Sequence, residues 1–358
     1  MRYLNILMIA LFLLSCKQDA GKSVNAVPEA EIGLITEHAM VVSARKEASQ
    51  IGSDIMKKGG NAFDAMVATE MALALTYPCA GNLGGGGFIV YRTKYGEIGA
   101  FDYREKAPLE ARKDMYLGLD GEFIQEKSKV GGLAVGVPGT LAGIFAVHQK
   151  LGTLPIEEIL QPVIDLANKG YVVTKKQAKR LAKYRAVFKK VNGENSIYTR
   201  SYGEGDTIKN SALANTLSRI STKGRSEFYN GETGRRMVDF IKSKSGIISM
   251  KDLSIYEAEW REPIVFDYKD LRIISMSPPS SGGICLAQIL KSIEKFPLKE
   301  YGHNSTKAIQ VITEAERRAY ADRSHFLGDP DFVDIPFDSL ISEGYLKSRM
   351  DDFSFDKA

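Results

Sequence analysis

The sequence contains little cysteine and histidine and only a small excess of positive charge. Its 358 residues include three cysteines and four histidines, and no cysteine pair has C-x-x-C spacing. Because zinc sites use closely spaced Cys and His ligands, we expect no metal site and no disulfide framework. Basic residues outnumber acidic ones by 48 to 44. Nucleic-acid-binding proteins need a strongly basic face, so this small excess argues against a nucleic-acid partner.

Long hydrophobic runs are also absent, and the longest apolar stretch lies at the start of the chain. Residues 1–15 place Arg2 before a short apolar run, which is typical of a secretory signal and too short to span a membrane. The run ends in Leu13-Leu14-Ser15-Cys16. This ending resembles the lipobox of bacterial lipoproteins, which implies cleavage before Cys16 and acylation of Cys16. The alternative is an ordinary signal peptide.

Residues 16–30 are expected to hold the lipidated Cys16 and a flexible tether, because the segment after Cys16 is polar and turn-rich. We therefore expect an exported protein that a lipid anchors to the bacterial membrane, on the periplasmic or cell-surface side. The rest of the chain, residues 31–358, is expected to form one domain.

Helices and strand pairs are predicted to follow one another without regular βαβ alternation. The residue patterns predict helices over 46–58, from the N-cap Asn61 to about Thr76, within 155–169, over 284–296 and over 306–327. Strands are predicted at 88–92 and 98–104, which form a hairpin, and at 264–268 and 271–276. This order favours a layered α+β architecture over a doubly wound sheet.

Two glycine-rich turns could be structural or could bind a ligand. Gly84–Gly87 lie between a helix and a strand, which is the reverse of the order in phosphate-binding loops, so nucleotide binding is excluded. Four glycines permit positive φ and a close approach of backbone or ligand. The turn at 278–283 leads into a helix, whose start could be simply capped or could hold an anion. Ser280 and Ser281 lack G-x-S-x-G spacing and a local histidine.

Arg104 lies at the end of a predicted strand and has two possible roles. As an ordinary surface residue it would pair with Asp102 or Glu105, and as a functional residue it would bind a ligand.

Two acidic patterns are expected to be structural. Asp329, Asp331 and Asp334 superficially suggest a calcium loop, but Asp334 occupies the position where that loop needs glycine, so a helix-ending turn is predicted. In the helix over 306–327, Glu314 precedes Arg318 by four residues, which predicts a solvated face with ion pairs.

Seven segments, in the same order along the chain, together resemble the γ-glutamyltranspeptidases, also called glutathione hydrolases. They run from about residue 33 to residue 334, and no single one of them is specific. The segments are 40–44 (MVVSA), 58–65 (KGGNAFDA), 78–88 (PCAGNLGGGGF), 102–108 (DYREKAP), 137–140 (VPGT), 278–283 (PPSSGG) and 320–324 (YADRS).

The resemblance implies an N-terminal-nucleophile hydrolase with a four-layer αββα sandwich. In this family one precursor cuts itself into a large and a small subunit. The threonine that begins the small subunit is the nucleophile, and its own α-amine is the base. A γ-glutamyl-enzyme forms, and the acyl group passes to water or an amino acid. The resemblance implies no cofactor.

The sequence departs from the family pattern because it stops at Ala358, before any segment like the T-T-H cleavage junction. The expected chain is therefore a large subunit or truncated precursor with an incomplete sandwich and no catalytic residue of its own. Arg104 is the one substrate contact that carries over, and the resemblance implies that it holds the α-carboxylate of the γ-glutamyl group. The implied partners are the small subunit, glutathione and other γ-glutamyl compounds, an acceptor amino acid or water, and the membrane.

Two other functions fit parts of this pattern. One is a related N-terminal-nucleophile amidase, which acts on cephalosporin side chains or poly-γ-glutamate. The other is a lipid-anchored binding protein that keeps the fold without catalysis. The intact Arg104 motif favours γ-glutamyl substrates, because such substrates carry a free α-carboxylate.

Overall fold

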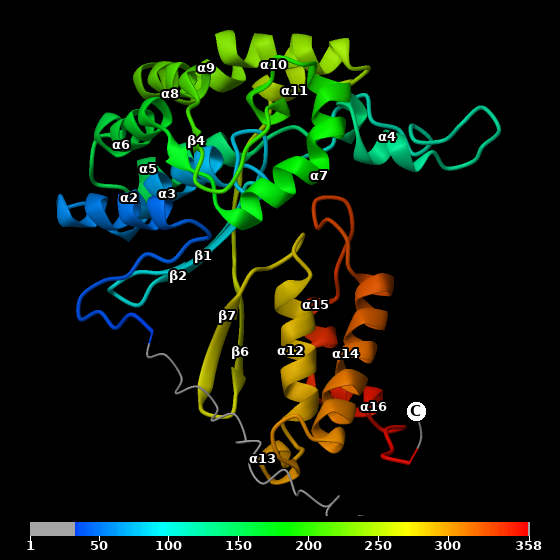
Figure 1. Cartoon of the computed structure of the whole chain (residues 1–358). Helices are drawn as coiled ribbons and strands as arrows, with labels where there is room; N and C mark the ends of the chain where they lie inside the picture. Colours follow the sequence, from blue (N-terminus) through cyan, green and yellow to red (C-terminus); the bar gives the residue numbers. More distant parts are fainter. Residues whose placement is uncertain (1–32, 357–358) are drawn as a thin grey trace, which may run out of the picture. The chain divides into compact units, whose positions relative to one another are not determined.

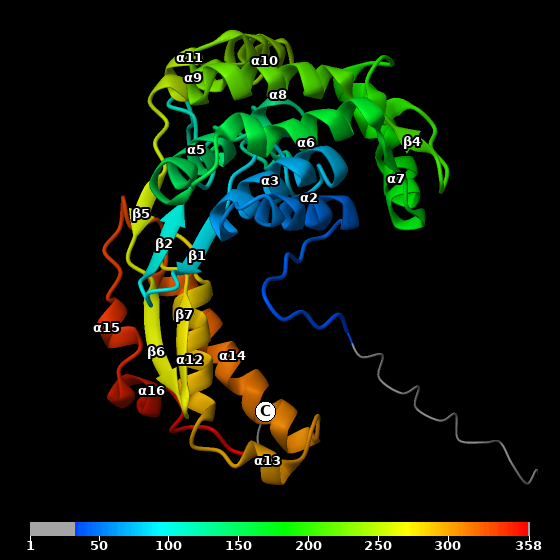
Figure 2. The same cartoon turned by 90° about the vertical axis from the view of Figure 1, so that its left-hand side faces the viewer.

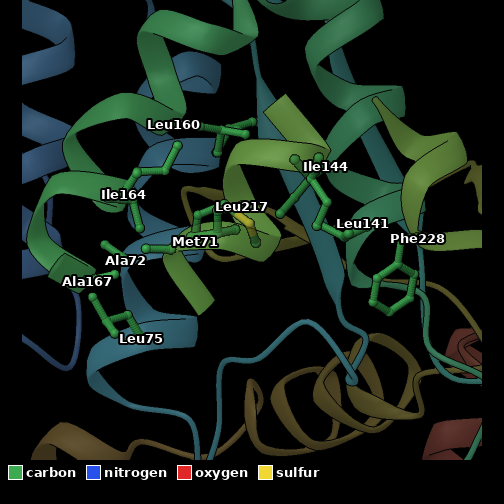
Figure 3. Close-up of a cluster of buried hydrophobic side chains, with 14 of the residues drawn as sticks. Met71, Ala72, Leu75, Leu141, Ile144, Leu160, Ile164, Ala167, Leu217 and Phe228 are labelled. Atoms are coloured by element: carbon green, nitrogen blue, oxygen red, sulfur yellow. The ribbon is translucent and has the colours of Figure 1, made fainter. Parts of the chain in front are cut away.

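The buried helix α3 (Ala62–Thr76) lies at the centre of the larger hydrophobic core. Asn61 caps it: the side chain of Asn61 accepts hydrogen bonds from the backbone of Phe63 and Asp64, and Asp64 bonds back to the Asn61 N–H. This capping box and the apolar composition of the helix explain why it forms and why it is buried. It contacts α2 (Lys46–Lys57), α5 (Thr140–Leu151) and α6 (Ile156–Lys169), as Figures 1 and 2 show. Figure 3 shows Met71, Leu75, Leu141 and Leu160 among the side chains of this core.

The computed structural model describes residues 33–356, and the chain from Val41 onward forms one compact unit. The signal segment 1–15, Cys16 and the tether to residue 30 lie outside the described residues. Among the residues that are described, no helix is both long enough and apolar enough to cross a membrane.

Asp64 also ties α3 to the turn after α5. Its carboxylate is buried and accepts bonds from Thr153 Oγ1 at 2.6 Å and from the Thr153 backbone N–H at 3.0 Å. Burial by itself raises the pKa of Asp64, but these hydrogen bonds from Thr153 and others from Asn61 outweigh it, so the pKa is lowered from its usual value. The carboxylate therefore stays charged although it is buried.

Further helices follow in the same compact unit, and of these α4 has no buried residue. They are α4 (Gln125–Lys129), α7 (Lys175–Asn192), α8 (Ser211–Lys223), α9 (Arg225–Tyr229), α10 (Glu232–Ser243) and α11 (Met250–Ser254), with 3-10 turns at Gly132–Ala134 and Ile197–Thr199. The short strands β3 (Tyr171–Val172) and β4 (Thr207–Ile208) pair beside α7. Helix α8 packs on α6, and this contact places the apolar face of α8 in the same core.

The first hairpin pairs β1 (Phe88–Arg92) with β2 (Ile98–Asp102), as predicted. A third strand, β5 (Glu259–Arg261), joins the other edge of β2 and was not predicted. The prediction that the second strand reaches residue 104 was wrong by two residues. Beyond Asp102 the chain leaves β5, and Lys106 pairs instead with Val137 across an isolated bridge.

The second hairpin, β6 (Ile264–Tyr268) and β7 (Leu271–Ser275), packs against α12 (Gly282–Ile293). Helix α14 (Thr306–Phe326) lies on α12 (Figure 1). The short helices α13 (Leu298–Tyr301), α15 (Phe337–Leu340) and α16 (Glu343–Arg349) complete this region. Within residues 33–356 the strands form one three-stranded and two two-stranded sheets, so the chain is mixed α and β, and the four-layer sandwich stays a prediction.

The predicted ion pair between Glu314 and Arg318 on α14 is confirmed, but the prediction of a solvated charged face was wrong for two residues. Arg318 and Asp322 are only 8% and 5% exposed. Arg318 pairs with Glu314 and Asp352, and its Nε donates to the Arg349 carbonyl at 2.6 Å. Asp322 pairs with Arg349 at 3.1 Å. The segment after residue 340 folds back over α14 and covers Arg318 and Asp322. The spacing of charges along the helix could not predict that they are buried.

Candidate functional site

A polar cleft of about 400 Å³ lies where the segment after β2 approaches the start of α12 and the end of α14. It brings together three of the segments that the sequence analysis singled out, because Arg104, Ser281 and Arg323 all line it. Its other lining residues are Asp102, Glu105, Lys106, Arg261, Pro279, Leu327, Gly328, Asp329 and Asp331. The cleft therefore gathers side chains that are more than two hundred residues apart in the sequence.

The backbone of Arg104 is held on both sides, while its side chain is exposed. The backbone N–H donates to Asp102 Oδ1 at 3.0 Å, and the carbonyl accepts from Tyr256 Oη at 2.7 Å. The Arg104 guanidinium has no hydrogen bond or ion pair within residues 33–356. The alternative that Arg104 pairs with Asp102 or Glu105 is therefore wrong. A fixed backbone with an unpaired guanidinium is well suited to binding an anion.

Glycines allow the Arg104 segment to pack directly on the backbone of the glycine-rich loop. A Cβ at Gly86 would lie 2.5 Å from the Tyr103 carbonyl oxygen and 2.7 Å from the Glu105 nitrogen. A Cβ at Gly139 would lie 1.9 Å from the same Tyr103 oxygen. None of the four glycines from 84 to 87 has a positive φ, so these glycines provide the close approach that was expected but not the left-handed backbone.

Two buried tyrosines, Tyr256 and Tyr229, bond to the backbone of the Arg104 segment and of the neighbouring Pro138. Tyr256 stacks on Tyr229 with ring centroids 5.8 Å apart. Tyr229 Oη donates to the Pro138 carbonyl at 2.9 Å and accepts from the Ala142 N–H at 3.1 Å. Burial raises the pKa of both phenols, so each stays protonated and can donate its hydrogen bond. Sequence reasoning missed both, because a lone tyrosine gives no signal of its partner.

Arg261 is surrounded by carboxylates. Its guanidinium lies 2.9 Å from Asp102, 3.2 Å from Glu259 and 3.3 Å from Asp331. Burial tends to lower the pKa of Arg261, but its bonds to Asp102 and Asp331 outweigh this and raise it. With its charge satisfied by protein groups, Arg261 joins β5 to the turn after α14. It is not available to a ligand in the way that Arg104 is.

Arg323 and Ser281 form the opposite side of the cleft. Arg323 Nε donates to Ser281 Oγ at 2.9 Å, and in the described part of the chain Arg323 has no acidic partner. Ser281 is the N-cap residue of α12 but makes no side-chain capping bond, so the expected capping of this helix is wrong. Ser280, one residue earlier, makes a local bond in which its Oγ accepts from the Gly282 N–H at 3.3 Å. Arginine cannot accept a proton, so Arg323 cannot activate Ser281 as a nucleophile.

The charges of the cleft suit a small zwitterion. Two guanidinium groups, Arg104 and Arg323, have no acidic partner among residues 33–356, and neither Glu105 nor Asp329 has a cationic one there. Carboxylates can therefore meet the arginines, while an ammonium group can meet the acidic side chains. Among the described residues, no group of three or more His, Cys, Asp or Glu side chains is placed to hold a metal ion. The Asp329–Asp331 segment forms a turn, in which Asp329 Oδ1 accepts from the Asp331 N–H.

Comparisons with known proteins find similarity along most of this chain. The family model described as gamma-glutamyltranspeptidase matches residues 48–358. The chain is 42% identical over 327 residues to the glutathione hydrolase proenzyme of Escherichia coli (strain K12), covering 90% of this chain and 56% of the relative. It is 35% identical over 319 residues to the acylase ACY 1 proenzyme of Pseudomonas sp. (strain V22), covering 87% and 57%.

A solved structure is similar along most of the described chain. The crystal structure of Helicobacter pylori gamma-glutamyltranspeptidase superposes with a TM-score of 0.88 and 42% identity, covering 91% of this chain and 94% of that one. By contrast, the chain spans little more than half the length of the two curated relatives named above. The match of the family model over most of the sequence, together with these identities, places this chain in the gamma-glutamyltranspeptidase family.

Proposed function

We propose that this chain is the large-subunit part of a γ-glutamyltranspeptidase that cleaves γ-glutamyl amides such as glutathione. A threonine at the start of a small subunit, made from the same precursor, attacks the amide and forms a γ-glutamyl-enzyme. Water or an amino acid then accepts the acyl group. The chain itself contributes substrate binding, and no residue in it acts as the nucleophile.

The unpaired guanidinium of Arg104 is the observation that carries this proposal. Its backbone is fixed by Asp102 and Tyr256, and its side chain lines a cleft of about 400 Å³. A planar guanidinium can bind a planar carboxylate through two parallel hydrogen bonds. The α-carboxylate of a γ-glutamyl group is the matching ligand, so Arg104 selects substrates that carry it.

Sheet edges and exposed apolar side chains support the proposed small subunit. Within the described chain, β1 pairs only with β2, and β7 pairs only with β6. Val90 on β1 is 40% exposed, Trp260 on β5 is 38% exposed and Leu271 on β7 is 55% exposed. Unpaired strand edges with apolar side chains favour pairing with further strands. We propose that the small subunit provides those strands.

Expression with and without the threonine-bearing half tests the proposed function. The purified 358-residue chain should not hydrolyse a chromogenic γ-glutamyl anilide and should aggregate or bind a hydrophobic dye. Co-expression with the other half should restore solubility and turnover together. Turnover by the chain alone that Ser281→Ala abolishes would contradict the proposal and would place the nucleophile at the start of α12.

The lipid anchor is part of the same proposal, although Cys16 lies outside the described residues. The mature protein is expected to begin at Cys16 and to fractionate with membranes. Replacing Cys16 by serine removes the thiol that would be acylated, so the variant should be released or left unprocessed. Mass spectrometry of the membrane fraction measures this. A Cys16→Ser protein of mature mass that still sediments with membranes would rule out the anchor.

A related acylase is the second candidate, because the ACY 1 relative is 35% identical. The two functions differ in what the substrate carries beside the scissile amide. A γ-glutamyl substrate brings an α-carboxylate and an ammonium group, and the cleft offers unpaired groups of both signs. A side chain that lacks the ammonium would gain no attraction from the exposed carboxylates of Glu105 and Asp329. The cleft therefore favours the γ-glutamyl substrate.

A further inference from the structure

Helix α7 carries a concentrated positive charge that the proposed function does not use. Its 18 residues, Lys175–Asn192, contain eight lysines and arginines and no acidic residue. The helix alone thus has a formal charge of +8, whereas the whole chain has +4. It is drawn in green in Figure 1, beside the core helices.

Four of these cations form a stripe on the solvent side of the helix. Lys175, Lys176, Lys179 and Lys183, called here the lysine stripe, fall within about a third of a turn at 3.6 residues per turn. All four are exposed. Leu181, the buried residue of α7, points the opposite way into the core. The stripe is therefore a single outward-facing row.

The other cations of α7 are engaged, and the stripe is not. Lys189 pairs with Glu194 at 2.8 Å and Lys190 pairs with Glu126 at 2.8 Å. Arg180 bonds to Tyr77 and Cys79, and Arg185 to Ser201. No residue between 33 and 356 forms an ion pair with a lysine of the stripe. The ammonium of Lys183 lies over the ring of Tyr184, which leaves its charge uncompensated.

This arrangement does not stabilise the helix. Lys175 and Lys179, and likewise Lys179 and Lys183, are like charges four residues apart, which repel each other on one face. Lys175 and Lys176 also lie at the helix N-terminus, where the macrodipole disfavours cations. A surface that opposes the stability of its own helix is explained if an anionic partner covers it.

We propose that the lysine stripe docks on an anionic lipid surface. The stripe is an extended row in which only Lys176 borders a cavity, so the row as a whole matches a plane of phosphate groups better than one small anion. Val187, four residues after Lys183 and on the same side of the helix, is 38% exposed, and such an apolar side chain can enter the membrane interface beside snorkelling lysines. Each lysine near an anionic bilayer strengthens binding about fivefold. The proposal requires neither the lipidation of Cys16 nor the proposed activity.

Lysine footprinting on vesicles tests the docking surface directly. The chain, co-expressed with the threonine-bearing half so that it stays soluble, is mixed with phosphatidylcholine vesicles that do or do not contain phosphatidylglycerol, and a water-soluble acylating reagent then labels its lysines. The stripe lysines should be protected several-fold on anionic vesicles only, and the protection should disappear in about 0.5 M salt, where charges are screened within a few ångströms. Lys295, Lys299 and Lys307, exposed elsewhere, should stay reactive. An anchored N-terminus would act on both vesicle types and so cannot mimic this difference.

Matched charge variants separate local docking from net charge. The variant Lys175→Gln/Lys179→Gln/Lys183→Gln should bind anionic vesicles about 100-fold more weakly, because three fivefold contributions are lost. The variant Lys295→Gln/Lys299→Gln/Lys307→Gln removes the same charge and should bind as the parent does. Glutamine keeps helix propensity and relieves the repulsion, so the Tm of the stripe variant should stay unchanged or rise. Equal losses in both variants, no protection on vesicles, or protection by soluble polyaspartate alone would overturn the proposal.

Discussion

In the assembled enzyme, replacing Arg104 by lysine should lower kcat/KM for a γ-glutamyl anilide about ten- to a hundredfold. Lysine keeps the positive charge but loses the planar fork that matches a carboxylate. The loss of one charged hydrogen bond costs about 1.5–3 kcal/mol, which corresponds to this fold-change. Steady-state kinetics of the parent and the variant measure it.

Two controls show whether the effect belongs to the carboxylate. An analogue whose α-carboxylate is an amide should be a poor substrate for both enzymes and should lose little more in the variant. Arg92→Lys changes another exposed arginine, at the end of β1, and should leave kcat/KM unchanged. Equal losses for the two substrates would mean that Arg104 acts structurally and would weaken the proposed substrate class.

Gly86→Ala should destabilise the assembled enzyme by about 1–3 kcal/mol and reduce γ-glutamyl turnover together. The added Cβ would meet backbone atoms of residues 103–105 at 2.5–2.9 Å, and backbone cannot move aside as a flexible side chain can. Overpacking of this kind typically costs about 1–3 kcal/mol. Because the displaced segment carries Arg104, the guanidinium would move as well. Thermal unfolding and kcat/KM measure the two effects.

Gly84→Ala is the matched control in the same loop. A Cβ at Gly84 would find only the Asn82 side chain at 3.4 Å, which is an ordinary contact. This variant should therefore keep both its Tm and its activity. If both substitutions proved equally harmful, the loop would require glycine for a reason other than its packing against the Arg104 segment.

Local features of the sequence predicted much of the secondary structure. Asn61 and Asp64 predict the start of α3 because a capping box forms between residues three apart. The first hairpin was also predictable from residues close together in the sequence, because only a short turn separates its two strands. Strand β5 was not, because three residues that join a distant strand leave no periodic signal.

The family resemblance was also available from the sequence, because it rests on short motifs in a fixed order. The motifs located Arg104, and the structure added that its guanidinium has no partner within residues 33–356. Whether Asp102 or Glu105 neutralised Arg104 could not be decided from their proximity in sequence. Asp102 instead pairs with Arg261, a residue 159 positions away.

Neighbouring residues and the order of the motifs were enough to predict the helices with strong caps, the hairpins, the mixed α and β class and the family. Which charges are paired depended on how distant segments pack against each other. This packing buried Arg318 under the segment after residue 340, held the Arg104 carbonyl with Tyr256, and placed Arg323 on Ser281. Electrostatic partners are set by distances in space, and folding brings together side chains whose separation along the chain carries no information about those distances.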